Sequence, residues 1–396
     1  MPKLNIFLFI SYVLVASGLL AGALLSPVVR SIAPAPLRDA LLPKPPAITV
    51  SLLYSTEKDG WLKDTIASFE ATQPHIDGRP IKINLEPLGS REIYLAVLDG
   101  TEKPDVISPA SSLQISILQE LAIRKNGTSP VTASDCRSAF STPLVLVAWR
   151  ERAEVLWGTN PGADLWHRLH DVLIDPAGWS KYGKDWGYVK FGQTDPLKSN
   201  SGLMAILLMT YSYFDRTANL SVNDVLNDQT YQQWFKDIQS TVGQFGESTG
   251  TYMHDMVAYG PSQYDLVAVY EASAIEQVPN AAGRYGELRV YYPPATVMSD
   301  HPFCTLNAAW VTPEKSQAAQ RFVDYLLARS AQELALKKYG FRPTDRSIDL
   351  AQPDSPFTRY TAYGLQADLS SLTLVEVPRG EVLDTLMSLW SRVARR

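Results

Sequence analysis

The sequence of 396 residues has little of several features that mark particular protein classes. It holds only 2 cysteines and 5 histidines, and its formal net charge is -5 with no block of like charge. Binding to a phosphate backbone needs clustered lysine and arginine, so we expect no nucleic-acid partner. The sequence also has no solenoid-type repeat and no long low-complexity tract, which leaves ordinary globular domains.

Charged residues are missing between Lys3 and Arg30. The run LNIFLFISYVLVASGLLAGALLSPVV (residues 4–29) is long enough to cross a bilayer as a helix, which needs about 20 apolar residues. We therefore expect an uncleaved N-terminal membrane anchor over residues 1–30. A cleavable signal peptide is the alternative, because small residues lie around positions 16–23. The run contains no cysteine, which argues against a lipoprotein anchor.

A linker is expected over residues 31–46, because proline at this density gives an extended spacer. Its prolines are Pro34, Pro36, Pro43, Pro45 and Pro46. The folded body is expected to begin near Ala47 and to lie outside the cytoplasmic membrane.

The two cysteines of the body, Cys136 and Cys304, predict one disulfide in an exported protein. Two separate buried thiols are the alternative. Neither cysteine has the neighbour spacing of a metal site, and we expect no cofactor and no metal.

The body alternates strand-like and helix-like segments. Strands are expected at residues 47–54, 81–85 and 104–108, and helices at 60–69, 91–98 and 113–123. This order implies an α/β fold with a parallel sheet and helices on both faces. Ligands of such sheets bind beyond the carboxyl ends of the strands. Further strands are expected at 144–149, 266–270, 288–292 and 305–311, and helices at 231–242, 316–339 and 381–393.

The segment FGQTDPLKSNSGLMAILL (residues 191–208) is a candidate ligand-binding turn. A polar bend that contains Asp195 leads into an apolar helix that opens with Ser199 and Ser201. Serine caps helix starts, and the free amides and positive dipole end of a helix attract anions or polar groups. A plain capped helix after a tight turn is the alternative.

Taken together, six segments resemble the bacterial extracellular solute-binding proteins of the type 2 periplasmic-binding-protein fold, which includes molybdate- and sulfate-type receptors. They are YSTEK (54–58), PDVISPASS (104–112), STPLVLVAW (141–149), GQTDPLKSNSG (192–202), FCTLNAAWV (303–311) and AAQRFVDYLLARSAQELALKKYGFRP (318–343). The resemblance implies two α/β lobes joined by crossover strands that act as a hinge. The first lobe would comprise residues 47–142 and 305–368, and the second residues 143–304. Residues 369–396 would form a C-terminal extension with a helix.

The resemblance also implies a ligand held between the lobes by three hydroxyl-rich turns. The candidate ligand-binding residues are Ser55, Thr56, Lys58, Ser108, Ser111, Ser112, Asp195, Ser199, Ser201 and Glu271. Hydroxyls and helix-start amides can bind oxyanions or polar molecules without a full countercharge. Lys58 is equally a candidate for a solvated helix residue, and Glu271 for a salt-bridged carboxylate. A bridge between Cys136 and Cys304 would tie the crossover strands together near the hinge.

Two enzymatic alternatives are weaker. Residues 55–58 match the S-x-x-K nucleophile motif of penicillin-interacting serine enzymes, but the accompanying K-T-G is absent. His167 and His170 could face one metal ion on a helix, but no third ligand accompanies them.

We therefore expect a binding protein and no enzyme. It would capture a small polar or anionic solute and deliver it to an ABC-type permease. The alternative is a stand-alone membrane-anchored sensor or adaptor that uses the same fold to regulate a partner or the cell envelope.

Overall fold

The computed structural model describes residues 2–24 and 45–394, which divide into two compact units. One unit comprises residues up to 48 together with 73–82. It contains the helix α1 (Pro2–Leu24) and the antiparallel pairing of β2 (His75–Ile76) with the start of β3 (Arg79–Leu88). No helix within the described residues combines the length and the apolarity needed to cross a membrane. The expected linker falls almost wholly outside them.

The second unit holds two sheets, and we call the parts built on them the first and second lobes. In the first lobe the strand order is β3, β1 (Ile48–Ser55), β4 (Val106–Ser108), β12 (Pro302–Thr305) and β5 (Cys136–Ser138). Strands β1 and β4 are parallel, whereas β12 is antiparallel to both of its neighbours. The helices α4 (Asp59–Ala71), α5 (Ser90–Asp99) and α6 (Ser112–Asn126) follow the strands as predicted.

The second lobe is organised around β6 (Phe140–Trp149), of which nearly every residue is buried. β6 pairs antiparallel with β8 (Leu266–Tyr270), β9 (Leu288–Tyr291), β11 (Met298–Ser299) and β13 (Arg342–Pro343), and β7 (Phe191–Gly192) pairs parallel with β8. Its helices are α7 (Arg150–Trp157), α8 (Leu165–Ile174), α9 (Asn200–Tyr213), α10 (Val222–Asn227), α11 (Gln229–Thr241), α12 (Thr249–Tyr259) and α13 (Glu271–Gln277).

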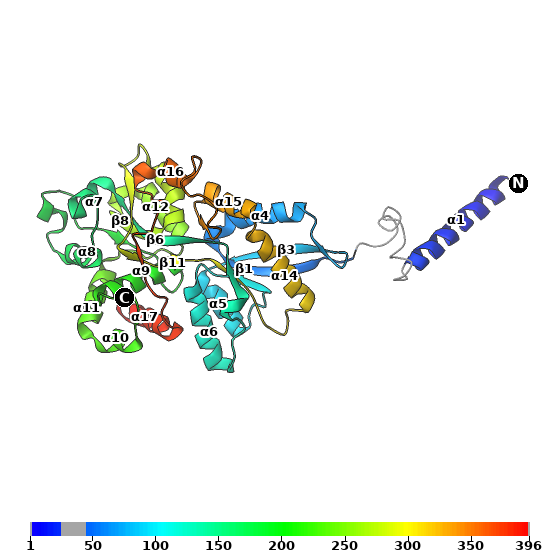
Figure 1. The fold of residues 1–396 in the computed structure, drawn as a ribbon, viewed down its shortest axis with the longest axis horizontal. Helices are drawn as coiled ribbons and strands as arrows, with labels where there is room; N and C mark the ends of the chain where they lie inside the picture. Colours follow the sequence, from blue (N-terminus) through cyan, green and yellow to red (C-terminus); the bar gives the residue numbers. More distant parts are fainter. Residues whose placement is uncertain (1, 25–44, 395–396) are drawn as a thin grey trace. The chain divides into compact units, whose positions relative to one another are not determined.

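The chain passes from one sheet to the other between Ser138 and Phe140, and again between Ser299 and Pro302. Figure 1 shows α7 to α12 gathered around β6 and β8, and α4 to α6 with α14 gathered around β1 and β3. Two sheets joined by such short crossings confirm the predicted two-lobe α/β fold.

Two predictions of secondary-structure elements were wrong. The single helix expected over 316–339 is two helices, α14 (Pro313–Leu326) and α15 (Arg329–Tyr339), because Ala328 between them has an extended backbone. The Ala331 carbonyl in α15 accepts a hydrogen bond from the Trp61 indole at 2.9 Å, which fastens this helix to α4. The strand expected over 305–311 lies earlier, at Pro302–Thr305.

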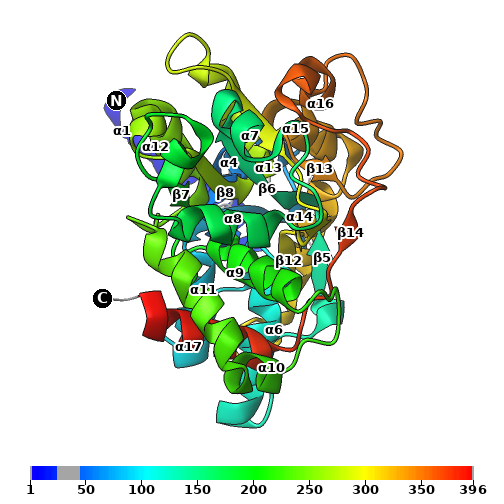
Figure 2. The same cartoon turned by 90° about the vertical axis from the view of Figure 1, so that its left-hand side faces the viewer.

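The C-terminal segment connects the two lobes. Its strand β14 (Thr373–Leu374) pairs with β10 (Ala295–Thr296), and its helix α17 (Gly380–Ala394) packs against α6 of the first lobe and α9 to α11 of the second. Figure 2 shows α17 beside these helices. Gly380 lies so close to α6 that a Cβ atom would be 2.5 Å from the Ser116 carbonyl oxygen, and the Trp390 indole donates to Gln239 at 3.0 Å.

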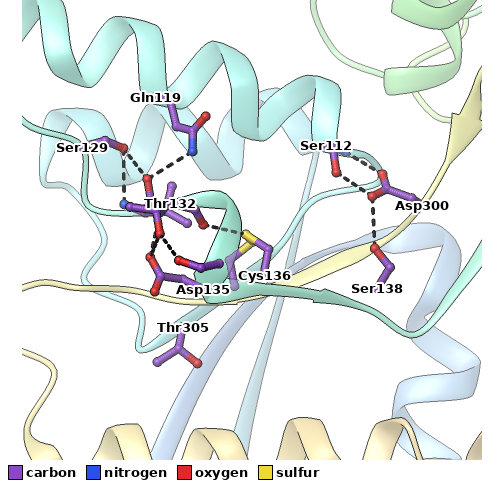
Figure 3. Close-up of a disulfide and its surroundings, with 12 residues drawn as sticks. Ser112, Gln119, Ser129, Thr132, Asp135, Cys136, Ser138, Asp300 and Thr305 are labelled. Carbon is purple, nitrogen blue, oxygen red and sulfur yellow. Dashed lines mark hydrogen bonds between the residues drawn. A yellow bond between two sulfur atoms is a disulfide. The ribbon is translucent and has the colours of Figure 1, made fainter. Parts of the chain in front are cut away.

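A disulfide joins Cys136 to Cys304, which confirms the predicted bridge. The two residues are directly paired on β5 and β12, close to the points where the chain crosses between the sheets. Beside the bridge, the Asp300 carboxylate accepts hydrogen bonds from the Ser112 amide at 2.7 Å and from the Ser138 hydroxyl at 3.0 Å (Figure 3). The disulfide and Asp300 together fix the crossing to the first sheet.

Candidate functional site

The first predicted turn follows β1. Because β1 and β4 are parallel neighbours, Tyr54 lies opposite Ser108, and the loops after both strands meet. The Ser55 hydroxyl donates to Glu57 Oε1 at 2.6 Å. Ser55 is buried, whereas Thr56 is exposed at the edge of the turn. The predicted meeting of these two loops is confirmed.

Lys58 is fully buried and links the two loops. Its Nζ atom lies 2.7 Å from Ser55 Oγ, 2.7 Å from the Ser108 carbonyl, 3.1 Å from Ser108 Oγ and 3.1 Å from the Pro109 carbonyl. Burial lowers the pKa of Lys58 to about 8, while Glu57 and Asp300 oppose this shift. An ammonium group has three protons to donate, so these acceptors already take all of its hydrogen bonds.

The same contacts show whether Lys58 can activate Ser55 as the S-x-x-K motif would require. A serine–lysine pair acts as a nucleophile only when the lysine can accept the hydroxyl proton. Lys58 Nζ instead faces two backbone carbonyl oxygens, which favour its protonated form. The geometry therefore supports a structural role for Lys58 in shaping the turn.

The second predicted turn contains Ser111 and Ser112 at the start of α6. The Ser111 hydroxyl donates to Asn200 Oδ1 at 2.8 Å. The Ser112 hydroxyl is held by Asp300 at 2.5 Å. Ser111 is thus directed towards the second lobe, and Ser112 towards the crossing strand.

The third predicted turn precedes α9. Asp195 stabilises the bend itself, since its carboxylate accepts from the Leu197 amide at 2.7 Å. Ser201 Oγ lies 2.7 Å from Thr249 Oγ1, and Ser199 Oγ lies 3.2 Å from the same atom. A Cβ atom on Gly202 would lie 2.3 Å from the Thr194 carbonyl oxygen, so only glycine allows this close approach.

Neither of the two long helices starting at the site is capped by its own serine. Ser111 before α6 and Ser199 before α9 have extended backbones, but their hydroxyls accept no hydrogen bond from the first-turn amides. A helix start carries positive partial charge from its free amides. At α6 the Ser112 amide donates instead to Asp300 at 2.7 Å, so the site combines buried hydroxyls with one helix start, that of α9, that has no side-chain cap from its own serine.

Asn200 is the residue through which the lobes touch at this site. Its Oδ1 atom accepts from Ser111 and, at 2.9 Å, from Gln114 of the first lobe, while its Nδ2 donates to the Tyr270 hydroxyl at 3.0 Å. Burial raises the pKa of Tyr270, which keeps this hydroxyl protonated. The bonds from Ser111 and Gln114 join the two lobes, and the bond to Tyr270 holds Asn200 in place within the second lobe.

His301 lies on the crossing between β11 and β12 and is fully buried. Its backbone φ of 43° is in the left-handed region, which is strained for a residue with a side chain. Its Nδ1 atom is 3.4 Å from Glu57 Oε1 but makes no hydrogen bond within the described residues. Burial, and then the neighbouring Lys58, hold its pKa well below the ordinary value, so the ring is neutral.

Glu271 is held in a buried ion pair. Arg342 donates to both of its carboxylate oxygens at 2.7 Å, and the Tyr292 hydroxyl donates to one of them. The salt-bridged alternative for Glu271 therefore matches the geometry, and the carboxylate faces Arg342 at the first turn of α13.

The cleft between the lobes is narrow. It encloses about 20 Å³ among Ser55, Glu57, Ser90, Asn200 and Thr249. A wider chamber of about 790 Å³ adjoins it and is lined by both lobes. A third cavity of about 980 Å³ lies between α8 and the end of α9 of the second lobe, with Thr373 of β14 also in its wall.

Several residues of this site were missed by the sequence analysis. Ser90 Oγ accepts from the Ala110 amide at 3.0 Å, and Ser248 and Thr249 begin α12. Asn200 lies within the predicted turn but was not predicted as a contact. His301 carries no local signal, because its role depends on a strand crossing that brings it to Glu57.

The histidines considered as metal ligands pack against aromatic rings. The His167 ring stacks on Tyr213 with centroids 6.2 Å apart, and the His170 ring stacks on Trp234 at 5.6 Å. Within residues 2–24 and 45–394, no three His, Cys, Asp or Glu side chains form a group that could hold a metal ion.

The family model of bacterial extracellular solute-binding proteins matches residues 50–342. No curated protein sequence matches the chain significantly.

Several solved structures have a similar fold. The periplasmic binding protein AfuA from Actinobacillus pleuropneumoniae, determined with fructose 6-phosphate bound, has a TM-score of 0.58 and 16% identity, with 87% of this chain and 98% of AfuA covered. Iron-bound HitA from Pseudomonas aeruginosa has a TM-score of 0.55 and 13% identity, with 88% and 99% covered. The sulfate-binding protein SubI from Mycobacterium tuberculosis has a TM-score of 0.51 and 16% identity, with 82% and 94% covered. At this identity the likeness establishes the fold.

Proposed function

Because the chain belongs to the family of bacterial extracellular solute-binding proteins, we propose that it captures a small polar or anionic solute between its lobes and delivers it to an ABC-type transporter. The family consists of binding proteins, not enzymes. The similar structures bind ligands as different as a sugar phosphate, iron and sulfate, so the ligand class depends on the site itself.

The observation that carries the proposal is that the first and third predicted turns line the same cleft. Hydroxyls from both lobes surround one cleft, next to the start of α9, which its own serine does not cap. In the proposed site Ser55, Thr56, Ser199 and Ser201 contact the solute. Asn200 changes its hydrogen bonds when the lobes separate to admit it.

The other predicted residues have supporting roles in this proposal. Lys58 and Ser108 hold the first two turns together, Ser111 and Ser112 position the start of α6, and Asp195 shapes the bend before α9. Glu271 stabilises the second lobe through Arg342.

A thermal-shift screen tests the proposal. The protein is heated with small anions, sugars and amino acids, and a solute that binds the folded state raises its melting temperature with concentration. For a solute found in this way, Ser55→Ala with Ser201→Ala should weaken binding by about tenfold or more, since buried hydrogen bonds are lost. Ser68→Ala and Ser240→Ala, on exposed helix faces of the two lobes, are the matched controls.

Unchanged affinity in the double variant would refute the proposed cleft. The absence of any binding solute would contradict transport and favour the sensor or adaptor alternative.

We also propose that the body lies outside the cytoplasmic membrane and is tethered by residues 4–29, a proposal that rests on the sequence alone. Fractionation of cells with a C-terminally tagged protein tests it. A protein that stays with membranes after alkaline extraction supports the anchor. A soluble protein whose N-terminus begins after the small residues 16–23 would show a cleaved signal peptide.

A further inference from the structure

The space available between the lobes bears on the kind of solute that fits. The cleft between the first and third turns encloses about 20 Å³, which is room for about one water molecule. The adjoining chamber of about 790 Å³ shares Thr56, Glu57, Ser248 and Tyr270 with it. Sites for organic ligands commonly measure about 300–1,000 Å³.

Both lobes build the walls of the chamber. The first lobe contributes the turn at Thr56 and the end of α15, and the second lobe contributes the start of α12 and one face of α13. Ile275 and Phe341 give apolar surface, which a bare inorganic ion cannot use. The chamber is therefore suited to a molecule with a carbon skeleton.

Ser273 on α13 supplies a polar group within this wall. The residue is 6% exposed and lines the chamber. Buried hydroxyls are normally paired, because an unpaired one loses its hydration without compensation. A polar atom of a ligand in the chamber would be within the wall to which this hydroxyl belongs, where the two can form a hydrogen bond.

Three cations also line the chamber, and they differ in their pairing. Lys337 lies 3.1 Å from Asp354, and Lys338 lies 2.6 Å from Asp64. Arg359 has no carboxylate partner in the described part of the chain; it donates to the Lys337 carbonyl at 3.4 Å and lies over the Tyr360 ring. Its planar guanidinium suits two parallel hydrogen bonds to a carboxylate or phosphate.

We infer that the solute is an organic anion rather than a bare inorganic oxyanion, and that its carbon skeleton fills the chamber while its charged group meets Arg359. This inference rests on the proposed function, because it assigns the ligand class of the same interlobe site. A carboxylate and a phosphate monoester share the chemistry that Arg359 recognises, and the probes below separate them.

Calorimetric titration of the full protein tests the inference. The probes are citrate, glycerol 3-phosphate and fructose 6-phosphate as organic anions, sulfate and phosphate as inorganic ones, and fructose and alanine as controls without net charge. We expect at least one organic anion to bind at a concentration where sulfate and phosphate do not. Comparing the affinity of citrate with the affinities of the two phosphate esters then shows whether the charged group is a carboxylate or a phosphate.

Two variants locate the binding. Arg359→Gln should weaken binding of the organic anion by about tenfold or more, since a charge-assisted hydrogen bond is lost. Arg346→Gln, at another exposed arginine, is its control and should leave affinity unchanged. Ser273→Phe should weaken binding by placing an aromatic ring at the wall of the chamber, whereas Ser273→Ala should have a small effect. Because Arg359 is exposed, its variant keeps the test valid even where Ser273→Phe destabilises the fold.

Sulfate or phosphate binding as tightly as every organic anion would overturn the inference, as would wild-type affinity in both Arg359→Gln and Ser273→Phe. Binding of fructose or alanine alone would overturn it while the proposed solute-binding function stands. No binding by any probe would count against both.

Discussion

The buried pair of Glu271 and Arg342 allows a quantitative prediction about stability. The two side chains are 0% and 8% exposed, and two hydrogen bonds of 2.7 Å join them. Removing one partner of a buried ion pair leaves the other charge uncompensated, which costs about 3–5 kcal/mol. Arg342 also donates to the Ala367 carbonyl at 2.8 Å, so it keeps one partner in the variant. We therefore expect the loss of stability in Glu271→Gln to lie near the lower end of this range, at about 3 kcal/mol.

Urea unfolding of the purified protein measures this loss. The control is Asp99→Asn, which breaks an exposed pair with Lys125 in which the side chains are 57% and 50% exposed. Exposed pairs contribute about 0.2–1 kcal/mol, so this control should change stability little. A double variant, Glu271→Leu with Arg342→Met, removes both charges and should recover much of the loss.

The prediction also separates the two roles considered for Glu271. A structural carboxylate gives a large loss of stability in Glu271→Gln and partial recovery in the double variant. A loss of less than about 1 kcal/mol, together with weaker solute binding, would refute the structural role and support direct contact with the solute.

Three further predictions follow from buried contacts. Serine at both Cys136 and Cys304 should destabilise the protein by about 2–5 kcal/mol in thermal unfolding, and a melting temperature unaffected by reductant would contradict a native bridge. Trp390→Ala should lower the free energy of unfolding in urea by about 3–5 kcal/mol, because the ring is buried between α17 and the second lobe. A loss of stability as small as that of a surface substitution would show that α17 is not packed against the second lobe. Folding lowers the pKa of Lys58 from about 10.5 to about 8, so between these pH values the unfolded chain binds more protons than the folded protein. The stability of the wild type relative to Lys58→Met should therefore rise as the pH increases from about 8 to about 10.5. A difference in stability that is flat over this range would contradict a buried ammonium group.

The loops of the site that could be predicted are those fixed by local rules. The turns at Ser55 and Ser108 follow parallel neighbouring strands, and strand ends of a parallel sheet meet at one edge. The turn before α9 could be predicted from its serine, asparagine and glycine. The bridge between Cys136 and Cys304 could be anticipated because only two cysteines occur.

The remaining features depend on contacts between distant parts of the chain. The partner of Glu271 lies 71 residues away, and no pattern near Glu271 indicates it. The break between α14 and α15 has no glycine or proline at Leu327 and Ala328, so apolar periodicity continues through it. His301 lies 244 positions after Glu57 in the sequence, and only the crossing between β11 and β12 brings its Nδ1 atom to 3.4 Å from Glu57 Oε1.

The central claim is that a solute binds between the two lobes. A crystal structure of the protein with the strongest solute from the screen tests it most directly. We predict that the solute contacts both lobes, with Thr56 on one side and Ser248 on the other, and that part of it lies over Ser273 in the chamber. A solute that contacts only one of the lobes, such as one in the cavity between α8 and the end of α9, would contradict the account.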